Sequence, residues 1–166
     1  MSNRIDYAKA APDGYRALGG VYATLQKGGL PKQLVDLVYL RVSQINGCAF
    51  CIDMHSRDLL KSGLAVEKLV LVPAWRDAGA VFGSRERAAL AWAESVTRVA
   101  ETHIPDADYH AAAAEFSDKE LAELTYAIGL MNVFNRLGVA FRSQPAAVAQ
   151  ALSAHGMAAP LHRRHS

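Results

Sequence analysis

The stretch from Asp36 to His55, DLVYLRVSQINGCAFCIDMH, indicates two helices joined by a short turn. Before the turn, apolar side chains recur with the helical period at Leu34, Val38, Val42 and Ile45. Asn46-Gly47 interrupts this pattern, and a second helix is expected from about Cys48 to Ser62, ended by Gly63 as a left-handed cap. The two helices therefore meet at the cysteines.

The second helix carries a thiol pair and an imidazole on one face. At about 100° per residue, Cys48, Cys51 and His55 point the same way, together with Ile52 and Leu59. Both cysteines lie in the first turn, where unpaired N–H groups and the helix dipole favour an anion and lower a thiol pKa. A thiolate attacks a peroxide or a disulfide, and a second cysteine three residues away can close on the sulfenic acid. The spacing predicts a redox-active pair.

Two different interpretations of the pair remain open. Free cysteines are often simply buried small residues. Cys48, Cys51 and His55 could instead hold zinc with Asp36 as a fourth ligand, although structural zinc sites usually draw their ligands from two separate loops. His55 alone would be read as a structural histidine, but its place one turn after Cys51 suggests an acid or base.

Asp36 is a candidate base on the preceding helix. It shares with Leu40, Ser43 and Gly47 the side that leads into the cysteine turn. A carboxylate among apolar neighbours is seldom buried without a partner. Asp36 is therefore expected either to pair with Arg41 or Lys32, or to face the site through water.

The rest of the chain also has helical patterns and no convincing strand. Helices are expected at 66–72, from a Ser84 cap to about Ala100, after Pro105, from the Ser117–Glu120 capping box to Phe141, and at 145–154. These segments predict an all-α bundle of six to seven helices in one domain, 1–166. The tail 156–166 is expected to be disordered, because Gly156 and Pro160 oppose a helix.

Composition excludes several classes of function. The 166 residues carry a net charge of +2, and their basic side chains are scattered without the interleaved aromatic residues of a nucleic-acid groove. The start shows no secretory signal, and no stretch approaches the roughly 20 apolar residues of a spanning helix. We expect a cytoplasmic protein with no membrane and no nucleic-acid partner. Thiols stay reduced in that compartment, so a structural disulfide is not expected.

The stretch 36–55 resembles the alkylhydroperoxidase AhpD core of the carboxymuconolactone decarboxylase superfamily. Further similarity lies at Ala74–Arg76, at Glu86–Trp92 and at Asn132–Arg136. The resemblance implies a helical homo-oligomer whose two cysteines reduce organic hydroperoxides. It also implies no bound cofactor, and re-reduction by a dithiol partner such as a lipoylated or thioredoxin-like protein.

Two positions depart from the family's pattern. The family's acid twelve residues before the first cysteine is usually Glu, and here it is Asp36, which is one methylene shorter. Better-characterised members carry a histidine between the cysteines, where this chain has Ala49-Phe50. The decarboxylase branch typically lacks the cysteine pair, so lactone decarboxylation is a poor second choice. A redox sensor without turnover and a zinc-stabilised scaffold are also compatible with the sequence.

Overall fold

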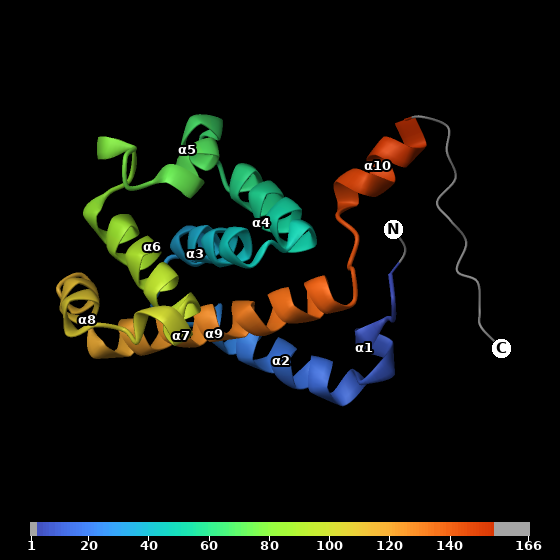
Figure 1. The fold of residues 1–166 in the computed structure, drawn as a ribbon, viewed down its shortest axis with the longest axis horizontal. Helices are drawn as coiled ribbons and strands as arrows, with labels where there is room; N and C mark the ends of the chain where they lie inside the picture. The colour runs from blue at the N-terminus through green and yellow to red at the C-terminus, as the bar shows by residue number, and fades with distance from the viewer. Residues whose placement is uncertain (1–2, 155–166) are drawn as a thin grey trace.

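The computed structural model describes residues 3–154, and these residues form helices without any strand (Figure 1). The all-α class expected from the sequence is confirmed. In chain order the elements are α1 (Tyr7–Ala10), α2 (Pro12–Leu25), α3 (Lys32–Asn46), α4 (Ala49–Lys61), α5 (Val66–Leu71), η1 (Val72–Ala74), η2 (Gly79–Val81), α6 (Ser84–Thr97), α7 (Val99–Thr102), α8 (Asp106–Ala113), α9 (Asp118–Ala140) and α10 (Ala146–Ala154). The two η segments are short 3-10 helices.

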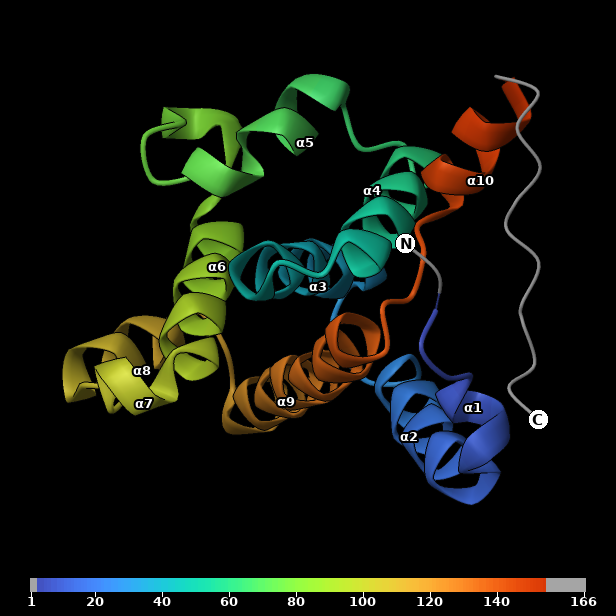
Figure 2. The same ribbon diagram turned by 45° about the vertical axis from the view of Figure 1, so that its right-hand side comes forward.

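Helix α3 runs through the middle of the molecule, with α4, α6 and α9 packed around it (Figures 1 and 2). Nine of its 15 residues are buried, so contacts surround the helix instead of following one stripe. The side chains with 1% exposure or less include Leu37, Val38, Tyr39, Leu40 and Val42. The dense apolar run at the start of the stretch 36–55 matches this burial on all sides of α3.

Two apolar clusters meet α3 from different sides. The first joins α3 to α6, α8 and α9 and includes Val38, Tyr39, Ala93, Ala112 and Ile128. The second joins α3 to α4, α6 and the η1 segment and includes Leu37, Leu40, Leu59, Val72 and Leu90. The helix that leads into the cysteine turn is therefore held by both clusters.

The capping signals are partly confirmed. Ser117 caps α9 as predicted: its Oγ accepts the Glu120 N–H at 3.4 Å, and the Glu120 carboxylate accepts the Ser117 N–H at 3.0 Å. The predicted Ser84 cap is wrong, because Gly83 occupies the N-cap of α6. The Glu86 carboxylate accepts the Gly83 N–H at 2.9 Å, so this helix start is stabilised without a serine cap.

The described residues form ten α-helices, more than the six to seven expected. The sequence does not predict α1 and α2, since α2 contains Gly14, Gly19 and Gly20 and buries none of its residues. Glycine is a weak helix former, so three glycines within one segment argue against a helix when the sequence is considered alone. The expected helix to Ala100 also divides at Arg98 into α6 and the four-residue α7.

A buried carboxylate, Glu94 on α6, ties three elements together. It accepts hydrogen bonds from Trp75 Nε1 at 2.8 Å, Arg41 Nε at 2.8 Å and Arg76 at 2.7 Å. Burial alone would raise the pKa of Glu94, but the hydrogen bonds from the indole and the two guanidinium groups outweigh it and lower the pKa. The carboxylate therefore stays ionised and links α3 and α6 to the segment after η1.

We expect Glu94→Gln to lower the free energy of unfolding by about 3 kcal/mol, because it leaves the largely buried Arg41 without its carboxylate. Urea unfolding followed by circular dichroism measures the change. The matched control is Glu101→Gln on α7, where the side chain is exposed. A loss no larger than that of the control would contradict this role for Glu94.

Among residues 3–154, no helix has both the length and the apolarity needed to cross a membrane. The predicted disorder of the tail 156–166 falls outside the described residues.

Candidate functional site

The turn between α3 and α4 sets the position of the first cysteine. Gly47 adopts a left-handed conformation with φ of 67°, and the Cys48 N–H donates to the Ser43 carbonyl at 3.0 Å. This pattern is a Schellman motif, which closes α3 and turns the chain sharply. Cys48 then becomes the N-cap residue of α4. The predicted meeting of two helices at the cysteines is confirmed.

Cys48 and Cys51 are joined by a disulfide, with their Cα atoms 5.3 Å apart. The Cys51 N–H donates to Cys48 Sγ at 3.3 Å, so the sulfur takes the part of an N-cap side chain. Both residues are nearly inaccessible, at 1% and 2% exposure. A reagent that acts on this pair must therefore approach through an opening beside it.

Gly138 on α9 makes room for the disulfide. A Cβ atom at this position would lie 2.9 Å from Cys48 Sγ and 3.6 Å from Cys51 Sγ. A side chain at position 138 would thus push either the sulfurs or α9 out of place. Sequence reasoning missed Gly138, because nothing near it in the chain signals the approach of Cys48 from 90 residues away.

His55 is buried one turn beyond Cys51, as the helical period predicted. Its ring lies 5.2 Å from the ring of Tyr39, and neither of its nitrogens has a hydrogen-bond partner among the described residues. The buried Tyr39 hydroxyl also has none among them. Burial lowers the pKa of His55 from 6.5 to about 4, against the opposing charges of Asp36 and Asp58. At neutral pH the imidazole is uncharged and able to accept a proton.

We expect His55 to make the fold less stable as the pH falls from 6.5 towards 4. The unfolded chain protonates this imidazole below about pH 6.5, whereas the folded chain does so only near pH 4. The unfolded state thus binds more protons in this window, and up to about 3 kcal/mol of stability is lost.

Urea unfolding at pH 7 and pH 4.5 tests this pH dependence. His55→Leu should show a smaller loss of stability between the two pH values than the wild type, since leucine binds no proton. The same change at the exposed His110 is the control. Identical pH dependence in the wild type and His55→Leu would contradict the prediction.

Asp36 is buried at 2% exposure and forms an ion pair with Lys32. The sequence favours Lys32 or Arg41 as the partner of Asp36, and the structure shows the pair with Lys32. Arg41, the second candidate, is bound to Glu94. Asp36 acts electrostatically on His55, yet no hydrogen bond joins the two. The structure therefore brings the acid close to the imidazole without connecting them directly.

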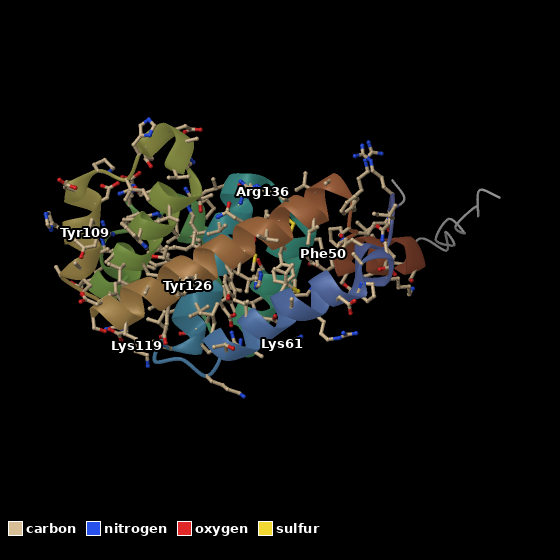
Figure 3. All side chains as sticks on the ribbon, turned by 90° about the horizontal axis from the view of Figure 1, so that it is seen from below. Phe50, Lys61, Tyr109, Lys119, Tyr126 and Arg136 are labelled. Atoms are coloured by element: carbon tan, nitrogen blue, oxygen red, sulfur yellow. A yellow bond between two sulfur atoms is a disulfide. The ribbon has the colours of Figure 1, made fainter. Side chains whose placement is uncertain are left out.

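A cavity of about 380 Å³ opens beside Cys51. Figure 3 shows Phe50, one of its lining residues, between α9 and α2. The cavity is lined by Tyr7, Tyr15, Gly19, Tyr22, Phe50, Cys51, Met54, His55, Asp58, Met131 and Phe134. Cys51 and His55 are thus on a common wall, whereas Cys48 is not among the lining residues.

Side-chain amides hold the cysteine turn against α9. The Asn46 side chain donates to Asn132 Oδ1 at 3.0 Å and to Asn135 Oδ1 at 2.9 Å. Asn135, which is fully buried, donates to Ser43 Oγ at 3.0 Å. Removing one partner from such a network leaves a polar group unpaired and lowers the stability of the fold. The network therefore fixes the end of α3 relative to α9. Its pairing spans about 90 residues and could not be predicted from the sequence.

No group of three or more histidine, cysteine or acidic side chains is placed to hold a metal ion within residues 3–154. The zinc interpretation required Cys48, Cys51, His55 and Asp36 to gather around one point. In the structure the two sulfurs are bonded to each other, and Asp36 is paired with Lys32.

Comparison with known proteins assigns the chain to a family. The model of the carboxymuconolactone decarboxylase family matches residues 12–95. The uncharacterised protein YdfG of Bacillus subtilis is 30% identical over 146 residues, covering 88% of this chain and 99% of YdfG.

Solved structures share the fold of this chain. A protein of unknown function from Agrobacterium tumefaciens, whose suggested role is the antioxidant defence protein AhpD, is 42% identical with a TM-score of 0.83, covering 87% of this chain and 98% of that one. The debrominase Bmp8 shares the fold, with 21% identity and a TM-score of 0.73 over 86% of this chain and 76% of its own. This chain belongs to the carboxymuconolactone decarboxylase family, and its Cys48–Cys51 pair places it among the AhpD-like members.

Proposed function

We propose that this protein is a thiol-dependent peroxidase that reduces organic hydroperoxides through Cys48 and Cys51. The observation that carries the proposal is the cavity whose wall includes both Cys51 and the buried His55. The disulfide between the cysteines is the oxidised state that such a cycle produces. The likeness to the Agrobacterium protein, with its suggested role in antioxidant defence, supports the same class.

In the first step Cys51 attacks the peroxide. Cys51 lines the cavity, whereas the sulfur of Cys48 packs against Gly138. His55, neutral at physiological pH, takes the thiol proton, and the nearby charges of Asp36 and Asp58 favour the imidazolium that forms although burial opposes it. The thiolate then bonds to the outer peroxide oxygen as the O–O bond breaks, which leaves Cys51 as a sulfenic acid. The alkoxide takes the proton back from His55 and departs as an alcohol.

In the second step Cys48 resolves the sulfenic acid. The Cys48 thiolate attacks Cys51 Sγ, the S–O bond breaks, and the disulfide forms. The leaving hydroxide takes up the proton that Cys48 lost and departs as water. The N-cap position favours the required Cys48 thiolate, because the Cys51 N–H points at this sulfur and the positive end of the α4 dipole lies there. The two cysteines thus have separate roles. Cys51 attacks the peroxide because it lines the cavity, and Cys48 resolves the sulfenic acid from the N-cap of α4.

An external dithiol completes the cycle. Its two thiols become a disulfide, and both cysteines regain their protons. Since the two sulfurs are nearly inaccessible, a slim reductant that enters the cavity fits this site best, such as the lipoyl arm of a lipoylated protein. A thioredoxin-like protein is a bulkier candidate. The cycle uses no bound cofactor. Assembly into a homo-oligomer and a cytoplasmic location stay predictions.

A steady-state assay with cumene hydroperoxide and dihydrolipoamide tests the proposal. We expect many equivalents of peroxide to be consumed for each chain, with none above background in the Cys48→Ser, Cys51→Ser double variant. A single oxidation per chain that no dithiol reverses would indicate a redox sensor instead. Bound zinc in protein purified without chelator, together with no turnover, would indicate the scaffold.

A further inference from the structure

We propose that the cavity beside Cys51 selects a neutral hydroperoxide whose organic group carries an aromatic ring. This inference rests on the proposed function and adds a substrate class to it. The lining residues favour a substrate that has an aromatic ring, carries no negative charge and is compact.

The walls of the cavity are mainly aromatic rings and thioethers. Five of the lining residues are aromatic, namely Tyr7, Tyr15, Tyr22, Phe50 and Phe134, and two are methionines, Met54 and Met131. Aromatic pairs prefer offset or edge-to-face contacts and gain energy beyond their buried area, and thioether sulfur also favours ring edges. A flat ring therefore has partners on several sides of this cavity, which a small aliphatic group would not use.

The aromatic wall from the N-terminal helices is already assembled. The ring of Tyr7 lies 6.0 Å from the ring of Tyr15 and 5.8 Å from that of Phe141, which follows α9. The ring of Tyr22 stacks on that of the buried Tyr39 at 6.3 Å, and Tyr39 in turn contacts His55. Rings held by one another lose little conformational freedom when a ligand binds, which favours affinity.

The charge at the cavity disfavours an anionic substrate. Among the described residues that line the cavity, Asp58 is charged and none is a lysine or an arginine. A fatty-acid hydroperoxide would bring its carboxylate to a wall without a cation to pair with it. A neutral substrate avoids this repulsion, and its ring can pack against the apolar walls.

The volume favours a compact substrate. At about 380 Å³ the cavity is near the lower end of the roughly 300–1,000 Å³ found for small-molecule sites. One ring with a short branched side chain suits this space better than a long lipid chain. Cumene hydroperoxide is a compound of this kind, and its reduction by Cys51 gives cumyl alcohol.

Binding can be measured without any turnover. The chain has four methionines, and two of them, Met54 and Met131, line the cavity. In the oxidised protein labelled with ¹³C at the methionine methyl groups, cumyl alcohol should shift the signals of Met54 and Met131 through its ring current. Met54→Leu and Met131→Leu assign these two signals. tert-Butanol should bind at least about tenfold more weakly.

Substrate competition gives the second measurement. We expect kcat/KM to be highest for cumene hydroperoxide, lower for tert-butyl hydroperoxide and lower by at least about tenfold for the anionic linoleic acid hydroperoxide. Tyr15→Leu should reduce the preference for cumene over tert-butyl hydroperoxide by about 2–12-fold, the usual contribution of one ring contact. Tyr126→Leu is the matched control, since Tyr126 is exposed on α9 away from Phe50 (Figure 3).

The two measurements separate this inference from the proposed function. Selective shifts of the Met54 and Met131 signals support the aromatic cavity even if no peroxide is turned over, in which case the peroxidase proposal alone fails. Equal binding of cumyl alcohol and tert-butanol, or a preference for linoleic acid hydroperoxide, would overturn the inference while the peroxidase activity could still stand.

Discussion

Cys51→Ser is expected to reduce peroxide turnover to the uncatalysed background, because serine at this position supplies no thiolate to the cavity. Cys48→Ser should also stop the steady-state cycle, but it should leave the first chemical step intact. Cys51 lines the cavity beside His55, while Cys48 packs under Gly138, so the attacking sulfur is present in one variant and absent in the other.

Mass spectrometry after one equivalent of peroxide distinguishes the two cysteines. Cys48→Ser should gain one oxygen atom at Cys51 and resist alkylation there, since no resolving thiol remains. Cys51→Ser should keep an alkylatable Cys48. The wild type should lose two hydrogens and block alkylation at both positions. The reverse pattern, with oxidation of Cys48 in Cys51→Ser, would assign the attack to Cys48.

The helices around the cysteines could be predicted because their signals are local. The apolar period before Asn46, the glycine after it and the Ser117–Glu120 box each involve residues within a turn or two of one another. Helices α1 and α2 could not be predicted in the same way. None of their residues is buried and α2 contains three glycines, so the local signals are weak. The structure shows α2 packed against α9 and α1 packed against α2, contacts that the sequence does not reveal.

In the candidate site, too, the features that depend on neighbouring residues could be predicted, and those that depend on distant residues could not. The shared face of Cys51 and His55 follows from helical geometry alone and is confirmed in α4. The sequence leaves the partner of Asp36 open between Lys32 and Arg41, and the structure shows the pair with Lys32, which lies four residues away on the same helix face. Arg41 is five residues from Asp36 and points to another side of α3, where it pairs with Glu94 from 53 residues away. The aromatic walls likewise come from α1, α2, α4 and α9, whose association the sequence does not show.

His55→Ala and Asp36→Asn are both expected to lower peroxide turnover by about 10² or more, the lower end of general acid–base contributions. His55 lies beside Cys51 on the cavity wall, and Asp36 is buried within electrostatic range of His55. Circular dichroism should show that both variants remain helical. The pH dependence of Cys51 alkylation in the reduced protein should change in both, because the thiol has lost a proton acceptor or the charge that supports it.

Two further variants separate a role in proton transfer from a role in the ion pair. Lys32→Ala removes the partner of Asp36 but keeps the carboxylate, so it should retain most of the activity if the carboxylate itself assists His55. Asp36→Glu adds one methylene, which allows the carboxylate to approach the imidazole that it does not contact in the structure, and it should hold or raise the rate. If Lys32→Ala and Asp36→Asn lower stability equally and neither changes the rate or the alkylation profile, Asp36 is an ion-pair residue and has no part in the reaction.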